Sequence, residues 1–247
     1  MKLSKQHKKS RGLHEKHFRG QQMSDIILGG QDGLVNVLGV VLGVASATNN
    51  SFIVLVAGLA ATFAETISMA AVAYTSKKAE RDYYNSERIL EEKEVETVPD
   101  EEVDEIREIY RKKGFKGRLL EQVVKVITSN KKVWIDTMMT EELNLTQRFD
   151  KSPLSSGLLV FFATLFGSFV PIIPFALQPV SSAIISSLVL CLLVLFTIGA
   201  IKARLTVGNW IVSGTELAII GTVAAATGYF IGLGLGKIFG TNVTAAG

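Results

Sequence analysis

Two apolar stretches of this sequence contain acidic residues, which are costly inside a membrane and usually functional there. In the first stretch, Asp25, Asp32 and Asn36 recur at steps that place them on one helical face with several glycines. Such a face also suits close packing of two helices, so a packing seam is the alternative. Asp32 lies about a third of the way into the stretch, which favours a role in moving a cation across the membrane. Asp25 is explained equally well as a helix cap.

The second stretch pairs a carboxylate with a thioether, because Glu65 and Met69 are one helical turn apart. This ligand pair suits a divalent ion of intermediate softness, such as Fe²⁺, better than it suits Mg²⁺ or Ca²⁺. Met69 alone would be an ordinary core residue. Glu216, near the start of the last apolar stretch, is either another acid of the pathway or an interfacial residue. The candidate pathway residues are therefore Asp25, Asp32, Asn36, Glu65, Met69 and Glu216.

The charged middle of the chain contains two pairs of glutamates spaced three residues apart. Glu91 and Glu94 form the first pair, and Glu102 and Glu105 form the second. Each pair lies on one face of a helix, and facing pairs of this kind build carboxylate metal sites in helical bundles. The alternative, which spacing alone favours, is a solvated acidic face paired with nearby Lys and Arg. A further unusual element, paired methionines expected to be exposed beside an acid, consists of Met138, Met139 and Glu142.

These residues need long apolar helices to hold them in a bilayer. The chain has 247 residues and is 48% hydrophobic, which is high for a soluble protein of this size. Five segments of about 20 residues are apolar enough to cross a membrane. They are Ile26–Ala47, Phe52–Thr75, Leu154–Ile173, Val180–Ala200 and Ser213–Leu235. The sequence therefore predicts an all-α polytopic membrane protein with five transmembrane helices.

The second span continues into charged sequence without a helix breaker. No Gly or Pro occurs between Gly58 and Pro99, so one helix is expected to leave the membrane and reach about Glu96. About 40 helical residues would extend roughly 60 Å. A break is expected at residues 97–99. Three amphipathic helices then follow, at about Asp100–Lys113, Gly117–Ser129 and Lys132–Leu143, and their apolar stripes predict a small bundle.

The distribution of charge predicts the orientation. All but five of the 23 acidic residues lie between residues 77 and 150, whereas the loops TNNS and PFALQP carry no charge. By the positive-inside rule, the N-terminus, the acidic segment and the loop at 201–209 lie in the cytosol. The basic residues thus lie where a membrane protein places them, which argues against nucleic-acid binding. The bilayer, divalent ions and protons are the expected partners.

The same pattern predicts five regions along the chain. The first, with seven Lys and Arg residues and no apolar signal segment, is expected to be disordered against anionic headgroups. The regions are a basic cytosolic tail at 1–24, two spans at 25–75, a cytosolic acidic helical domain at 76–152, three spans at 153–240 and a non-cytosolic C-terminal tail at 241–247. The acidic domain is thus inserted between transmembrane helices two and three.

The chain resembles the vacuolar iron transporter family, which includes the yeast vacuolar iron/manganese carrier. The likeness rests on DIILGGQDGLVNVLGV, ISMAAVAY, the charged helix ending in TVPDEE, and WIDTMMTEELNL, and it extends from about Asp25 to the end of the fifth span. The resemblance implies a homodimer, a cytosolic metal-binding domain and exchange of Fe²⁺ for protons, and no enzymatic activity. Candidates for the dimer seam are the Gly39/Gly43 face and the Gly228/Gly232/Gly236 face.

The resemblance also implies roles for single residues. Asp32 and Met69 would line the pathway, with Asp25 near its cytosolic mouth. The metal-binding residues would be Glu91, Glu94, Glu102, Glu105, Met138, Met139 and Glu142. One departure concerns the second span, where relatives resemble AGLAE and this chain has AGLAAT. Ala61 stands at the place of that acid, and Glu65 follows four residues later on the same face, about 6 Å further along the helix.

Three functional hypotheses involve a metal ion, and a fourth, a membrane protein with an acidic helical domain and no metal, is disfavoured by the resemblance. The first is a dimeric antiporter that moves Fe²⁺ out of the cytosol, across a vacuolar, other organellar or prokaryotic plasma membrane, with Mn²⁺, Co²⁺, Ni²⁺ and Zn²⁺ as further candidate ions. The second is a manganese exporter of the same fold, which would tolerate loss of the Met69 thioether. The third is a membrane-anchored iron-binding or di-iron protein without transport. Ferritin-like di-iron sites need Glu-x-x-His motifs, and no histidine follows His17, so this hypothesis is the weakest.

Overall fold

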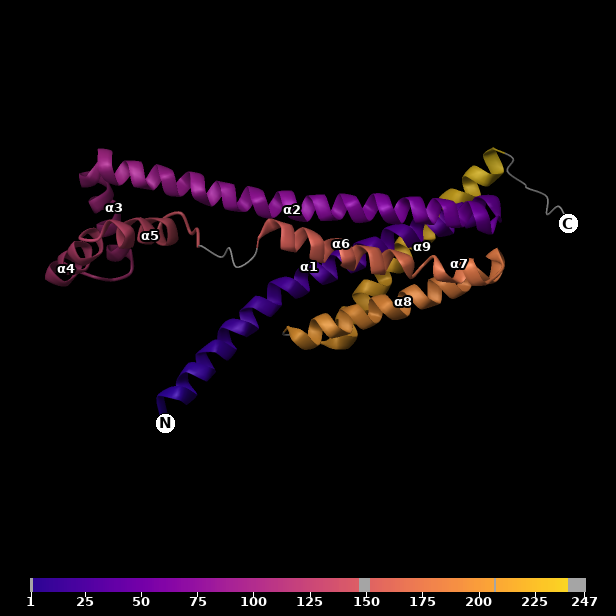
Figure 1. Cartoon of the computed structure of the whole chain (residues 1–247), viewed down its shortest axis with the longest axis horizontal. Coiled ribbons are helices and arrows are strands. Elements are labelled where there is room, and N and C mark those ends of the chain that lie inside the picture. Colours follow the sequence, from indigo (N-terminus) through magenta and orange to yellow (C-terminus); the bar gives the residue numbers. More distant parts are fainter. Residues whose placement is uncertain (1, 147–151, 207, 240–247) are drawn as a thin grey trace. The chain divides into compact units, whose positions relative to one another are not determined.

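The computed structural model describes residues 2–146, 152–206 and 208–239, with side chains from residue 23 onward (Figure 1). All regular structure in these ranges is helical. The helices are α1 (Lys2–Thr48), α2 (Ser51–Thr97), α3 (Pro99–Lys112), α4 (Gly117–Thr128), α5 (Lys131–Glu141), α6 (Pro153–Phe169), α7 (Ile173–Leu177), α8 (Val180–Leu205) and α9 (Trp210–Ile238). The chain separates into two compact units. The apolar unit comprises Met1–Tyr74 with Pro153–Gly247, and the acidic unit comprises Thr75–Ser152.

The first helix begins much earlier than the sequence predicts. A disordered tail is expected over residues 1–24, but α1 starts at Lys2 and continues without interruption to Thr48. The expectation of disorder is therefore wrong. The physical reason is that Lys, Arg, Gln and Leu all favour helix, and no proline interrupts them. Because the apolar part of the helix supplies a nucleus, extending it costs little per residue.

The second helix is continuous, as the absence of Gly and Pro predicts. A tight turn separates it from α1, with Asn49 in the left-handed region at a φ of 48°. Asparagine tolerates this conformation, and Asn50 then accepts a hydrogen bond from the Ile53 amide at 3.2 Å. The helix runs from Ser51 to Thr97, and one residue, Val98, separates it from Pro99, the first residue of α3. The predicted break at residues 97–99 is confirmed.

The third predicted span is shorter than expected. The sequence predicts one helix over Leu154–Ile173, but α6 ends at Phe169. Pro171 lacks an amide hydrogen and disfavours helical geometry at the residue before it, so the chain turns and resumes as α7. Four helices of the described chain are long and apolar enough to cross a membrane. They contain the other four predicted spans, while α6, with 17 residues, is at the lower limit of spanning length.

Close backbone packing joins α1 to α9 in the apolar unit. A Cβ added to Gly228 would lie 2.1 Å from the Gly39 carbonyl oxygen, and one added to Gly232 would lie 1.9 Å from that of Gly43. Only glycine permits this approach. Both glycine faces are predicted candidates for the seam between two copies. The structure corrects that prediction, because the two faces pack against each other within one chain.

This packing predicts a strong position dependence of glycine substitutions on α9. Gly232→Ala is expected to lower the melting temperature of the detergent-solubilised protein by roughly 5 °C or more, because a Cβ there meets backbone that cannot move away. Gly234→Ala is the matched control, since a Cβ at that position meets nothing within 4 Å. Fluorescence-detected thermal unfolding measures both variants. Equal melting temperatures for the two would contradict the α1–α9 packing.

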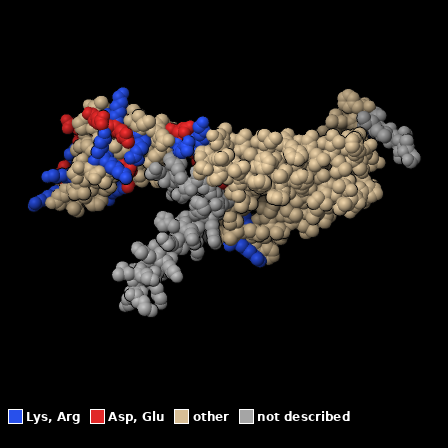
Figure 2. All heavy atoms as spheres, in the orientation of Figure 1, with Lys and Arg blue, Asp and Glu red and all other residues tan. Residues whose placement is uncertain are grey.

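The acidic unit is held together by a small apolar core of its own. Its four helical segments bury Ile106, Val124, Trp134, Met138 and Met139 in one cluster. The side-chain oxygen of Asn130 caps α5 by accepting hydrogen bonds from the backbone amides of Lys132 and Val133, at 3.0 and 3.2 Å. Figure 2 shows Asp, Glu, Lys and Arg gathered over this unit, whereas the visible face of the apolar unit carries few charges. The two units thus differ in chemistry as well as in packing.

Candidate metal-binding sites

Five glutamates from three helices come together in the acidic unit. They lie on α2 (Glu91 and Glu94), on α3 (Glu102 and Glu105) and at the C-terminal cap of α5 (Glu142). The negative charges of the other four all act on Glu91. Glu91 and Glu102 are each only 4% exposed, which is rare for carboxylates without a partner cation. Five of the seven predicted metal ligands therefore form one acidic cluster.

Burial and mutual repulsion raise the pKa values of three glutamates of this cluster, Glu91, Glu102 and Glu142. Burial raises the pKa of Glu91 to about 7, and the carboxylates of Glu142 and Glu102 add to the shift. Burial, followed by the charge of Glu105, likewise raises the pKa of Glu102 to about 7. The Glu142 side chain is exposed to solvent on one side. Its partial burial, followed by the charge of Glu105 and a hydrogen bond with that carboxyl, still raises the pKa of Glu142 to about 7. Carboxyls in such contact share either a proton or a cation.

Two carboxylate oxygens of the cluster have no hydrogen-bond partner among the residues that the structure describes. They are the Oε2 atoms of Glu91 and Glu102, and both are buried. A buried carboxylate without a hydrogen bond or counter-charge is strongly unfavourable. A divalent cation bound between α2 and α3 would remove this penalty. No three His, Cys, Asp or Glu side chains of the described chain already converge as a metal site, so binding requires the carboxylates to rotate.

The bases of the acidic unit that form ion pairs in the described structure pair with acids outside the cluster. Arg107 pairs with Asp104 and Glu121, and Arg111 pairs with Glu108 at 2.9 Å. Among the residues that the structure describes, none of the ten ion pairs includes any of the five clustered glutamates. A solvated face neutralised by Lys and Arg therefore does not describe these five residues. Their charge is left for a cation from solution.

The two methionines lie in the apolar core instead of on the surface. Met138 and Met139 are 0% and 1% exposed and belong to the cluster around Ile106. The expectation of exposed methionines beside an acid is thus wrong, because α5 turns this face inward to complete the core of the unit. Their role as sulfur ligands stays a prediction. It requires a sulfur to reach the glutamates from within the core.

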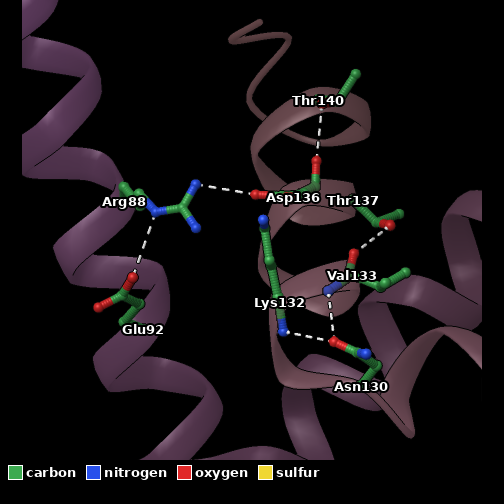
Figure 3. A network of polar contacts seen from close by, with 8 residues as sticks. All are labelled: Arg88, Glu92, Asn130, Lys132, Val133, Asp136, Thr137 and Thr140. Carbon is green, nitrogen blue, oxygen red and sulfur yellow. Dashed lines mark hydrogen bonds and ion pairs between the residues drawn. The ribbon is translucent and has the colours of Figure 1, made fainter. Parts of the chain in front are cut away.

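An arginine bridge fixes α5 against α2 (Figure 3). The Arg88 guanidinium donates a hydrogen bond to Asp136 on α5 at 2.9 Å and lies 3.3 Å from the Glu92 carboxylate on its own helix. Thr140 donates to the Asp136 carbonyl at 2.8 Å and continues the network along α5. Because Glu142 follows on α5 and Glu91 adjoins Glu92 on α2, the bridge helps to position both ends of the acidic cluster.

A second, smaller site lies between α1 and α2 in the apolar unit. Asn36 donates a hydrogen bond to Oε1 of Glu65 at 3.0 Å. Asp32 lies within hydrogen-bonding reach of both residues. Three of the six predicted pathway residues are thereby brought together. Two carboxyls in contact must hold a proton or a cation between them, so this trio can alternate between the two.

The other three predicted pathway residues stand apart from this trio. In the described structure, no hydrogen bond or ion pair joins Asp25, Met69 or Glu216 to it. The Glu216 side chain is exposed near the start of α9, and those of Asp25 and Met69 are half-buried. Their roles in a pathway stay predictions.

Sequence reasoning missed two hydroxyl groups beside the trio. Thr164 and Ser168 on α6 are buried, without hydrogen-bond partners in the part of the chain described, and they pack on Gly29 and Gly33 of α1. These two glycines flank Asp32 along the helix. Other hydroxyls of the apolar unit, such as that of Thr222, donate to the carbonyl four residues earlier. The spacing of four between Thr164 and Ser168 in an apolar helix is the signal that could have identified them.

The raised carboxyl pKa values predict a stability that falls with rising pH. Between the ordinary value of 4.5 and about 7, the folded acidic unit binds more protons than the unfolded chain does. Without metal, its unfolding free energy should therefore rise as the pH is lowered from about 8 to about 6. Thermal unfolding of the full protein in detergent with a chelator measures this. Stability that is flat or increases with pH would contradict the buried cluster.

Comparison with known proteins identifies clear relatives. The VIT family model matches residues 23–233. Vacuolar iron transporter 1 of Arabidopsis thaliana is 35% identical over 217 residues, which cover 87% of each chain. The protein of the same name from Tulipa gesneriana is also 35% identical, over 87% of this chain and 88% of its own. The vacuolar iron transporter of Toxoplasma gondii is 33% identical over 231 residues, covering 90% and 76% respectively. These relatives are named as transporters, so the predicted resemblance is confirmed, and so is the prediction that the chain is not an enzyme.

Proposed function

This chain belongs to the VIT family, and from that premise we propose that it carries Fe²⁺ out of the cytosol in exchange for protons. The names of its relatives support iron as the cargo. The observation that carries the mechanism is the trio of Asp32, Asn36 and Glu65, which joins two acids from two helices able to span a membrane. A carboxyl pair that releases its proton when it binds a cation supplies the exchange that an antiporter needs.

The acidic unit captures the ion before it enters the membrane. We place this unit in the cytosol, where the positive-inside rule puts it. Glu91, Glu94, Glu102, Glu105 and Glu142 concentrate Fe²⁺, and rotation of Met138 or Met139 toward them would add a soft ligand that favours Fe²⁺ over Ca²⁺ or Mg²⁺. Metal binding displaces protons from carboxyls whose pKa is about 7, so capture weakens as the cytosol becomes acidic.

The ion then passes to the trio inside the apolar unit. Asp32 and Glu65 bind it with carboxylate oxygens, and Asn36 orients Glu65 through its hydrogen bond at 3.0 Å. Met69, one turn from Glu65, would add a thioether on the same helix. In the opposite half-cycle the same oxygens take up protons. Glu65 would here take the role of the acid that the family resemblance implies at the place of Ala61.

The proposed topology has five spans, with α6 as the shortest. It keeps a cytosolic region at 1–24, spans at 25–75, the acidic domain at 76–152, spans at 153–240 and a non-cytosolic end at 241–247, the last of which lies outside the described residues. We also infer a homodimer. The apolar part of α2 supports this, because its Phe52, Phe63 and Ile67 are each more than half exposed in one chain. A second copy or lipid must cover that face.

Flux measurements in liposomes test the proposal. Purified protein is reconstituted with an Fe²⁺-sensitive dye and a pH dye inside, and reduced iron is added outside. The expected result is Fe²⁺ entry together with proton exit, which the pH dye reports as alkalinisation of the liposome interior. Protein-free liposomes are the control. Mn²⁺ in place of Fe²⁺ measures the selectivity. Tight metal binding without any flux would overturn transport and leave a membrane-anchored iron-binding protein.

A further inference from the structure

A cavity of about 310 Å³ opens between α1 and the C-terminal end of α8. Its walls combine two kinds of surface. Leu28 and Leu205 contribute apolar area, while Gln31, Thr206 and Lys202 contribute an amide, a hydroxyl and a cation. All of these residues belong to the apolar unit, and none is part of the trio around Asp32. The cavity is therefore separate from both candidate metal-binding sites.

The cavity carries a net positive charge. Lys202 is the one charged residue among the described side chains that line it. No acidic residue in the described ranges forms an ion pair with Lys202. The two acids of α1 whose side chains are described, Asp25 and Asp32, do not line the cavity, although their neighbours on the helix do. An anionic group would balance this lysine.

Neighbouring residues place the cavity at the level of lipid headgroups. The Arg204 guanidinium lies 5.8 Å from the centre of the Trp210 ring, at the junction between α8 and α9. Tryptophan and basic residues at the ends of spans mark the boundary between the hydrocarbon and the headgroups. Lys202 lies one half-turn from Arg204 on the same helix end, and its alkyl stem can follow the apolar wall while the ammonium group stays near the surface.

We propose that this cavity binds one anionic phospholipid. Its phosphate would lie at Lys202, with a hydrogen bond from the Gln31 amide, and the upper part of one acyl chain would lie along Leu28 and Leu205. The Thr206 hydroxyl donates to the Lys202 carbonyl at 2.9 Å and so holds the end of α8 in place beside the cavity. The apolar wall favours a lipid over free phosphate, and the unpaired lysine favours an anionic headgroup over a zwitterionic one. Because Gln31 directly precedes Asp32, a bound lipid would also restrain the turn of α1 that holds the trio.

Native mass spectrometry of the full protein tests this inference. The detergent-solubilised protein is offered equal amounts of phosphatidylglycerol and phosphatidylcholine. We expect the wild type to retain phosphatidylglycerol about fivefold more than phosphatidylcholine, the contribution of one basic residue. Lys202→Gln should abolish that preference. Arg204→Gln is the matched control, since Arg204 lies two residues away but does not line the cavity, and it should keep the preference.

A second variant separates the cavity from surface charge. Leu205→Trp places a larger side chain in the cavity without changing its charge, so it should reduce lipid retention. Elution of the variant as a single peak in size-exclusion chromatography shows that it is folded. The proposal is overturned if Lys202→Gln retains the preference, if Arg204→Gln loses it to the same degree, or if inorganic phosphate alone displaces the lipid. These outcomes do not depend on the proposed transport, because the measurement requires no flux.

Discussion

Replacing Asp32 by asparagine is expected to reduce Fe²⁺ flux into proteoliposomes at least about 100-fold. Asparagine keeps the size of the side chain and its contact with Glu65, but it can neither bind a proton nor contribute negative charge. The trio then holds a single carboxyl, and the charge of a divalent ion bound there would be only half balanced. Fe²⁺ entry and proton exit should disappear together, because the same oxygens serve both ions.

Two comparisons show whether this loss is specific. Glu65→Gln should behave like Asp32→Asn, since both acids belong to the same contact. Asp25→Asn should reduce the flux less than Asp32→Asn does, because no hydrogen bond or ion pair in the described chain joins Asp25 to the trio. Stabilisation of the acidic unit by added Fe²⁺ should persist in all three variants. Flux above half of the wild-type rate in Asp32→Asn would refute the central role of the trio.

Replacing Glu91 and Glu102 together by glutamine is expected to weaken metal capture about 100-fold or more and to raise the melting temperature of the metal-free protein. The two effects have one cause. Both carboxylates are buried with an oxygen that has no partner, so at neutral pH their charge destabilises the fold until a cation arrives. Glutamine has nearly the same shape without the charge. Thermal unfolding with and without Fe²⁺ or Mn²⁺ measures both effects at once.

The matched control for this pair is Glu108→Gln. Glu108 lies on the same helix as Glu102 but pairs with Arg111 at the surface, where an ion pair contributes little. Metal-induced stabilisation should be unchanged in this variant, and so should the metal-free melting temperature. A double variant that lowers the metal-free melting temperature while keeping full metal response would show that the buried carboxyls serve the fold and not the ion.

Much of the helical architecture follows from local sequence. The continuity of α2 depends on the absence of Gly and Pro after Gly58, and its end depends on Pro99. Both can therefore be predicted from the positions of these residues in the sequence. The same reasoning fails for α6, because a hydropathy window that spans Pro171 averages over the residue that stops the helix. It also fails for the basic N-terminal segment, where charge suggests disorder but helix propensity and the adjoining helix favour α1.

The sequence by itself determined which residues could do the chemistry, because acids in apolar segments and glutamates spaced three residues apart can be recognised without knowing the tertiary structure. The tertiary structure alone decided which of them meet. It joined Asp32 to Glu65 across two helices, paired none of the described bases with the five glutamates, and turned Met138 and Met139 into the core. It also packed Gly43 on Gly232 within one chain. The physical reason is that contacts between helices depend on the facing and depth of each side chain, which periodicity defines only within a single helix.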